Sequence, residues 1–486
     1  MLIIPIFIYI LAILIVAWQT GKHKHKAGKF MEEYFIGSRS MGGLVLAMTL
    51  ISSYVGASSF IGGPGVAYNL GLSWVFLACI QVPTAFFTLG ILGKKLAIIS
   101  RKINGVTITD YLRARYESNL VIVLASLMML IFFIGTIVAQ FVGGARLFES
   151  VTGLSYNFGL ILFTAVVIIY TTFGGFRAVT ITDAIQGIVM LLATGLLFFI
   201  ILEKGNGMEN IMQSILKTNP NLLTPDSNGA VSKPFILSFW MLVGVGVLGL
   251  PVTEVRCMGF KDSKAMHRAM IIGTSIVGIL MLGMHLVGVM GAAVEPGVEV
   301  GDKIIPILAI KNMHPILAGV FIAGPLAAIM SSVDSLLIMS SAAIVKDLYI
   351  NYIDKNPSES KIKKLSFATS LLLGIIVFIL ALNPPKLLVW INLFALAGQE
   401  AAFFCPILLG LYWKRANATG AAVSMIFSVV FYLYTVIMNI KIMNIKIMNM
   451  HQIVPTIIFS ILLFTIGSYF GKPNSEKVNE LFFSEK

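Results

Sequence analysis

The amino-acid sequence predicts an all-α polytopic membrane protein with about thirteen transmembrane helices. Hydrophobic residues make up 57% of the 486 residues and charged residues only 12%, against about 25% in an average soluble domain. Runs of about 20 mostly apolar residues, each long enough to cross a bilayer as a helix, recur along the chain. This composition excludes a soluble enzyme, a disordered chain and a nucleic-acid-binding module, despite the net charge of +13.

The expected spans follow from these apolar runs, because in lipid only helices or closed barrels satisfy their backbone hydrogen bonds, and runs this long are typical of helices. In chain order the spans cover residues 2–19, 41–69, 72–93, 119–145, 154–174, 183–202, 234–255, 270–293, 315–345, 365–382, 387–412, 418–438 and 453–471. The first run lacks a basic segment before it and an A-x-A-like site before Lys22. We therefore expect a retained span and not a cleaved signal peptide.

The connecting segments predict the orientation. With the N-terminus outside, the segments on the cytoplasmic side hold 26 of the 35 lysines and arginines. Because cytoplasmic loops of membrane proteins are enriched in these residues, we expect the N-terminus outside and the C-terminus inside. The outer loops contain no pattern of a folded domain, so we expect one transmembrane domain covering residues 1–486.

Other chemistry finds no support in the sequence. The chain contains no G-x-x-x-x-G-K-[ST] motif, so ATP-driven transport by this chain alone is not expected. No serine–histidine–aspartate or paired-carboxylate pattern indicates an enzyme. The three cysteines and six histidines show no metal-ligand spacing. We expect no cofactor.

Two of the predicted spans contain sequences that weaken a helix. Within 52–65 lie four glycines, four serines and a proline, and the span at 234–255 repeats the device with three glycines before Pro251. Proline removes a backbone donor, and a glycine costs roughly 1 kcal/mol relative to alanine. The freed carbonyls need water, another helix or a cation as partners at membrane depth.

The two interrupted spans are five spans apart, each the first of a block of five. Blocks of odd length face opposite ways across the membrane. Interrupted helices at matching positions in two inverted halves are typical of a secondary transporter with its binding site near the midplane. The alternative is glycine for close helix packing with prolines at tolerated kinks.

Polar groups inside the other spans add candidates for ion binding. Ser331, Ser332 and the carbonyl of Ala328 present hard oxygen ligands of the kind an alkali cation prefers. The two hydroxyls could instead bond to the preceding helical turn. Asp183 opens the span at 183–202, where it is either an N-terminal cap or a cation relay on the exit path. Gln81 and the pair Gln399–Glu400 are more typical of helix–helix hydrogen bonds than of ligand contacts.

The sequence resembles a known family, the sodium:solute symporters, along almost the whole chain. The segment YTTFGGFRA at 170–178 looks like one family signature, and LYWKRANATGA at 411–421 looks like the second. Segments at 33–43, 57–65, 140–147 and 346–349 resemble the family members that carry pantothenate.

The resemblance implies a LeuT-like core of two five-helix inverted repeats, spans 2–6 and 7–11, and sodium-coupled import by alternating access. It implies a sodium site formed by the carbonyls of Ser52, Val55 and Ala328 and the hydroxyls of Ser331 and Ser332. The aspartate matching Asp183 has a proposed part in sodium release. Sodium is thus the expected coupling ion. The protein is expected in the cytoplasmic membrane of a bacterium.

For the solute, the resemblance implies pantothenate, a small anion with hydroxyls and an amide. Its polar groups would suit Ser58, Ser59 and Gln81, with Tyr54 or Gln399 as further candidates. Proline-transporting relatives have an aspartate at the position of Tyr54, and relatives in the family often have a histidine at that of Val252. Substrate contacts therefore do not transfer simply. Proline, a sugar or a monocarboxylate are alternative solutes, and a channel or membrane sensor is an alternative of another class.

Overall fold

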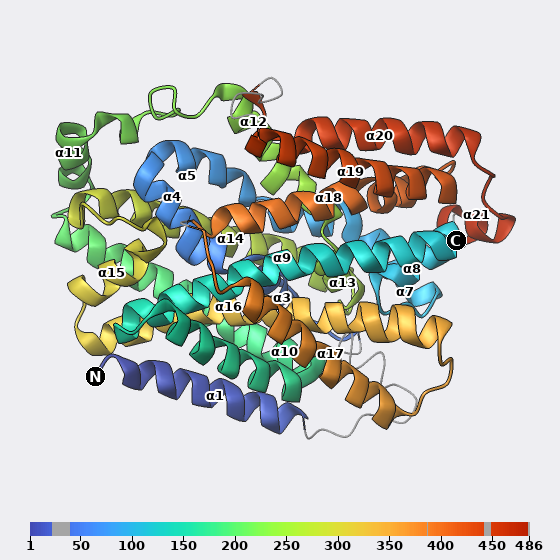
Figure 1. Ribbon diagram of the computed structural model, residues 1–486, viewed down its shortest axis with the longest axis horizontal. Helices are drawn as coiled ribbons and strands as arrows, with labels where there is room; N and C mark the ends of the chain where they lie inside the picture. The colour runs from blue at the N-terminus through green and yellow to red at the C-terminus, as the bar shows by residue number, and fades with distance from the viewer. Residues whose placement is uncertain (22–38, 386, 442–448, 485–486) are drawn as a thin grey trace.

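The computed structural model describes residues 1–21, 39–385, 387–441 and 449–484 of the chain. Of the resemblance segment at 33–43, residues 33–38 lie outside this part. The described chain is helical, and its one β pairing is an isolated bridge between Met41 and Phe260. Figure 1 shows the helices running along the long axis, with the N-terminus and the C-terminus at opposite ends of the bundle.

The first half of the chain contains α1 (Ile3–Gly21), α3 (Gly43–Tyr54), η2 (Ser58–Gly62), α4 (Gly63–Leu70), α5 (Leu72–Ala78), η3 (Cys79–Gln81), α6 (Thr84–Phe87), η4 (Thr88–Gly93), α7 (Lys94–Lys102), α8 (Ile108–Tyr116), α9 (Asn119–Thr152), α10 (Tyr156–Lys204), α11 (Met208–Thr218) and η5 (Pro220–Leu223), where η marks short 3-10 or π segments. The second half contains α12 (Lys233–Val243), η6 (Val245–Gly249), α13 (Pro251–Met258), α14 (Ser263–Val294), η7 (Gly301–Lys303), α15 (Ile304–Asn312), α16 (Pro315–Ala342), η8 (Ala343–Ile350), α17 (Glu359–Leu380), α18 (Val389–Tyr412), α19 (Ala418–Lys441), α20 (Ile453–Phe470) and α21 (Glu476–Phe483).

The helix lengths confirm a polytopic membrane protein. In the described part of the chain, nine helices are long and apolar enough to cross a membrane, or up to eleven if each of two bent pairs is one span. Two shorter apolar helices, Ile3–Val16 and Tyr156–Ile168, coincide with the first and fifth predicted spans. The count of thirteen stays a prediction.

The boundary between the fifth and sixth predicted spans differs from expectation. The spans at 154–174 and 183–202 both fall within α10, which is helical from Tyr156 to Lys204. No proline occurs in this segment, so nothing in the chain forbids helical hydrogen bonding through it. Asp183 therefore lies inside a helix, and its interpretation as an N-terminal cap is wrong.

Side-chain burial separates the inner helices from the outer ones. The apolar stretch is 83% buried in the span Pro315–Ile350 and 78% buried in α18, but only 28% buried in α17. Large apolar side chains remain exposed on the outer helices, as expected of a surface that faces lipid. Examples are Ile131, Leu192, Phe199, Ile271, Ile375 and Leu380. The interior position of α16 and α18 makes them the helices on which a buried site can form.

Local signals explain where the helices begin and end. Thr107 and Asp110 form a capping box at the start of α8, and Ser118 caps α9, which ends at Gly153 with φ of 70°.

Both predicted interruptions are confirmed: α3 meets the segment Ser58–Leu70 at 70°, and the segment Lys233–Gly249 meets α13 at 42°. The fold thus contains two bent spans at the positions where the sequence weakens a helix.

Candidate functional site

The break in the first bent span exposes backbone groups in the middle of the bundle. Helix α3 ends at Tyr54, Val55 has an extended backbone, and the chain becomes helical again at Ser58. The amide of Ala57 donates to Oε1 of Gln140 on α9 at 2.7 Å. A Cβ atom at Gly56 would lie 2.5 Å from Gln140 Oε1 and 2.8 Å from Ser332 Oγ. A side chain at position 56 would therefore displace Gln140 or Ser332 from the break.

Five oxygens from α3 and α16 meet at this break. Ser331 Oγ lies 2.9 Å from the Ser52 carbonyl and 3.1 Å from that of Ala328. Ser332 Oγ lies 3.4 Å from the Ser52 carbonyl, 3.2 Å from that of Val55 and 3.1 Å from that of Ala328. All five residues are buried. The structure thus brings together every residue that the sequence assigned to a sodium site.

A count of hydrogens shows what this cluster lacks. Two serine hydroxyls carry one donor hydrogen each, yet they make five short contacts with three carbonyl oxygens. Two hydrogens must serve all five contacts, so the hydroxyls share them among several acceptors and leave the carbonyl oxygens incompletely satisfied. A small cation removes that deficit. Sodium has nearly the radius of calcium, whose oxygen ligands lie at about 2.3–2.6 Å, and oxygens about 3 Å apart can share such an ion.

Asp183 lies beside this cluster. Its backbone carbonyl accepts from Ser52 Oγ at 2.9 Å, and its Oδ2 accepts from Thr49 Oγ1 at 2.6 Å. Arg256 lies 3.4 Å from Oδ2 and also donates to Ser53 and Ser335. Arg256 is thus a buried partner of Asp183. No sequence spacing reveals a pair that is 73 residues apart.

A cavity adjoins the other side of the break. Four of the predicted solute contacts line it: Tyr54, Ser58, Ser59 and Gln81. Tyr54 OH lies within hydrogen-bond distance of Gln81 Oε1 (3.1 Å) and the Val243 carbonyl (3.2 Å). The fifth candidate does not line it: Gln399 donates from Nε2 to Thr136 Oγ1 at 3.2 Å and belongs to the contact between α18 and α9.

Sequence reasoning missed three further residues of this cavity: Trp74, His285 and Asn392. In the described chain, Trp74 Nε1 and Asn392 Oδ1 are buried without a hydrogen-bond partner, as is Ser58 Oγ. His285 is within hydrogen-bond distance of the Met281 carbonyl through Nδ1 (2.5 Å). A Cβ atom at Gly63 would lie 2.1 Å from its Nε2. Only His285 had a signal, as the one ionisable residue of its span.

The cavity is small in this conformation. Its volume of about 40 Å³ holds a few waters, whereas sites for small organic ligands occupy about 300–1,000 Å³. On one side the η7 loop covers α4, and a Cβ at Gly65 would lie 2.6 Å from the backbone of Gly301. Asp302 in this loop accepts from the Leu388 amide at 3.0 Å. Burial raises the pKa of Asp302 to about 6, although the Leu388 N–H lowers it.

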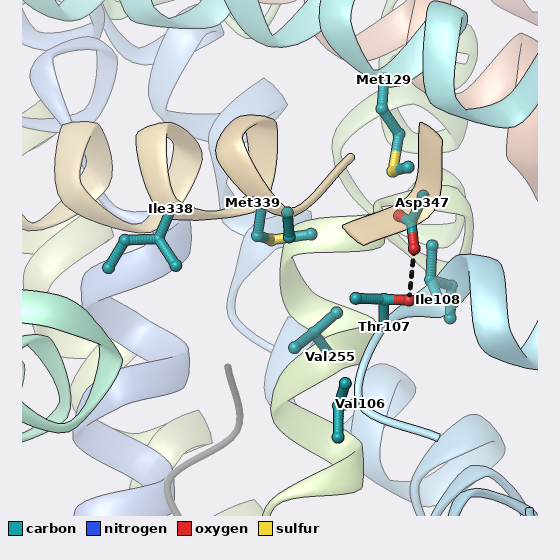
Figure 2. A pocket seen from close by; sticks show the side chains of 9 residues that line it. Val106, Thr107, Ile108, Met129, Val255, Ile338, Met339 and Asp347 are labelled. Carbon is teal, nitrogen blue, oxygen red and sulfur yellow. Dashed lines mark hydrogen bonds between the residues drawn. The ribbon is translucent and has the colours of Figure 1, made fainter. Parts of the chain in front are cut away.

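The opposite end of α16 is tied to α8. Figure 2 shows Thr107 and Asp347 facing one another, with Thr107 Oγ1 3.1 Å from Asp347 Oδ1. Lys346 forms an ion pair with Asp110 and lies 3.8 Å from Asp347 Oδ1. Burial raises the pKa of Asp110, but Lys346 and nearby backbone N–H groups lower it by more, so the pKa lies below its ordinary value. We call these four residues the α8–η8 tie.

The second break also faces a polar side chain. A Cβ atom at Gly246 would lie 2.3 Å from Oε2 of Glu400 on α18. Glu400 is fully buried, and neither carboxyl oxygen has a hydrogen-bond partner within the described residues. The sequence interpretation of this residue as a helix–helix hydrogen bond is therefore wrong. An ionisable group at membrane depth is costly, and we have no structural account of what satisfies this one.

Comparisons with known proteins place the chain among transporters. The profile of the Sodium:solute symporter family matches residues 34–428. The Sodium/pantothenate symporter of Escherichia coli (strain K12) is 47% identical over 450 residues, covering 92% of each chain. The Osmoregulated proline transporter OpuE of Bacillus subtilis (strain 168) is 32% identical, over 99% of this chain and 97% of that one. A solved Na+-coupled sialic acid symporter superposes with a TM-score of 0.79 at 21% identity, covering 98% and 99% of the two chains.

The fold and these matches define a multi-pass membrane protein of a transporter class. The chain belongs to the sodium:solute symporter family.

An added methyl group at Gly56 should destabilise the protein, whereas one at an uncrowded glycine should not. We expect Gly56→Ala to lower the melting temperature of the detergent-solubilised protein by several degrees, because overpacking costs about 1–3 kcal/mol. Gly195→Ala on α10 is the matched control, since nothing lies within 4 Å of its Cβ position. Equal melting temperatures for the two variants would contradict the close approach at Gly56.

The α8–η8 tie predicts a difference between two lysines at one end of the molecule. Lys346→Met leaves the buried carboxylate of Asp347 and the partly buried one of Asp110 without their cation, so amides of α8 should exchange hydrogen about tenfold faster or more. Lys361→Met removes an exposed pair with Asp354 at 2.8 Å, and exchange should stay within about twofold. Hydrogen-exchange mass spectrometry measures both. Unchanged α8 exchange in Lys346→Met would show that the tie contributes nothing.

Proposed function

We propose that this chain imports pantothenate together with sodium across the cytoplasmic membrane of a bacterium by alternating access. One observation carries the proposal: two candidate sites share one broken helix. Ser52 and Val55 turn their carbonyls to the serine pair of α16, while Tyr54 and Ser58 line the neighbouring cavity. A cation bound on one side of the break fixes the backbone that forms the other side.

The coupling follows from this shared backbone. Without sodium, the Ser52, Val55 and Ala328 carbonyls share the two serine hydrogens, and the break is held weakly. With sodium, the five oxygens gain a common partner, and Tyr54 and Ser58 take fixed positions for the solute. Asp183 lies next to Ser52. Its carboxylate is the first that a sodium ion would meet on the path to the cytoplasm. The reaction needs no covalent step and no cofactor.

The architecture of the transport cycle is part of the proposal. The spans at 41–69 and 234–255 begin two inverted five-helix repeats within one transmembrane domain, with the first span and the last two peripheral. The N-terminus lies outside and the C-terminus inside, as the distribution of lysine and arginine indicates. The η7 loop then closes the cavity from the outside, and the α8–η8 tie closes the path from the inside.

Pantothenate is supported by similarity and by chemistry. The relative named for this solute is 47% identical to the chain, and the proline transporter 32%. The cavity offers an unpaired hydroxyl at Ser58, an indole donor at Trp74 and an amide acceptor at Asn392. These groups complement the hydroxyls and amide of pantothenate. Its carboxylate suits the positive end of the half-helix that begins at Ser58.

A second solute class has one specific observation in its favour. The match to the proline transporter OpuE spans nearly the whole chain, so the fold and the sodium site suit proline import as well. Tyr54 stands where proline-transporting relatives have an aspartate, which disfavours a cationic group of the solute there.

Uptake of labelled pantothenate into proteoliposomes tests the proposal. With an inward sodium gradient at fixed pH, we expect accumulation above equilibrium, and without sodium only slow equilibration. Unlabelled pantothenate should compete, whereas proline, glucose and lactate should not. Sodium-dependent uptake of another solute in place of pantothenate would keep the coupling and reject the substrate. Uptake indifferent to sodium would reject the mechanism.

Alanine variants of two serines on α16 test whether Ser332 is a sodium ligand. We expect Ser332→Ala to raise the sodium concentration for half-maximal uptake at least several-fold, because one of five ligands is lost. Ser340→Ala is the matched control: Ser340 is equally buried, and its hydroxyl has no hydrogen-bond partner in the described chain. Both variants should reach normal protein levels. An unchanged sodium dependence in Ser332→Ala would remove that serine from the site.

A further inference from the structure

A hollow of about 570 Å³ lies away from the transport path, where α7, α8, α9 and α21 come together. Its volume is within the range of small-ligand sites and far exceeds that of the small solute cavity. Lys102, at one edge, is the last residue of the apolar span Leu72–Lys102, and Asn119, at another, is the first residue of the span Asn119–Thr152. The hollow therefore lies where two spans leave the membrane, at the depth of lipid headgroups.

The charge of the hollow is positive and uncompensated. Lys102, Arg113 and Lys477 line it from three different elements, against one carboxylate, Glu117. In the described chain none of the three cations forms an ion pair. Three cations from α7, α8 and α21 converge here although like charges repel. A bound anion gives that arrangement a partner.

Arg113 supplies a more specific observation. Its guanidinium lies over the ring of Tyr352, 5.7 Å from the centroid, which holds the group in place. The terminal nitrogen NH2 is buried and has no hydrogen-bond acceptor within the described residues. Buried polar groups nearly always find a partner, and a guanidinium matches the oxygens of a phosphate group. An oxyanion that reached this nitrogen would satisfy the unused donor.

Part of the wall of the hollow is apolar. Ile103, Ala114, Val478 and Leu481 contribute it, the last two from the helix α21 near the C-terminus. A free inorganic ion would leave this surface wet, whereas an amphiphile covers it with its glycerol and upper acyl segments. Basic pockets beside the ends of transmembrane helices are suited to anionic lipid headgroups.

We propose that this hollow binds an acidic phospholipid, with the phosphate on Lys102, Arg113 and Lys477 and the apolar part against α21. Lipid binding would hold α21 against α7 and α8. The lipid would thereby connect α21 to α8, which is part of the α8–η8 tie. The site is independent of the transported solute and of the sodium ligands.

Lipid binding to the purified full chain tests the site. The probe is phosphatidylglycerol titrated into protein held in phosphatidylcholine nanodiscs, with melting temperature and native mass spectrometry as readouts. Phosphatidylglycerol should raise the melting temperature of the unmodified protein by several degrees. Lys102→Gln with Lys477→Gln, both exposed positions, should lose most of that rise and weaken the apparent affinity about tenfold or more.

Two controls make the result decisive. Lys264→Gln with Lys472→Gln removes the same charge from exposed positions outside the hollow and should keep the full rise. Arg113→Gln should lose lipid adducts in mass spectrometry even if its stability falls. An equal loss in the control pair, or no rise in the unmodified protein, would overturn the site. A full rise with soluble glycerol 3-phosphate alone would overturn the assignment to a lipid.

Discussion

The structure depends on one constraint: a helix that stops inside the bilayer must give its freed backbone groups new partners. At Val55 the helix α3 ends in the protein interior, where water is scarce and an unsatisfied carbonyl costs several kcal/mol. Gln140 satisfies an amide on one side, and the serine pair of α16 approaches the carbonyls on the other. The serines bring two hydrogens for five oxygen contacts, a deficit that the proposed sodium ion would fill.

The buried helix α16 connects the five-oxygen cluster with the rest of the molecule. The same helix carries Ser331 and Ser332 near its middle, continues into η8 and ends at the tie with α8. Asp183 and Arg256 form a buried pair between the sodium cluster and that end. The breaking of such a pair leaves an unpaired buried charge, so the cluster and the pair resist separate movement. Together they hold α16 against the broken helix.

Much of this was predictable because membrane helices follow simple rules. Apolar run length predicted a helical membrane protein, though not the continuous helix α10. Glycine with proline predicted both breaks, since those residues act on their own backbone. The serine pair was visible for the same reason, although only resemblance to the family joined it to Ser52 and Val55. The pairing of Arg256 with Asp183 and the placement of Trp74, His285 and Asn392 around the cavity were not predictable. They depend on how distant helices pack, and no local pattern encodes that. Gln399 was assigned to the solute from its position in a span, whereas its helix face turns toward α9.

The most direct test of the central claim is the hydrogen exchange of the amides at residues 55–60, measured in sodium and in an equal concentration of choline. If sodium holds the break by binding its carbonyls, exchange at these amides slows several-fold in sodium, and the slowing is lost in Ser331→Ala and Ser332→Ala. The same exchange rates in sodium and in choline would contradict the account, because the broken helix would then keep its geometry without the ion.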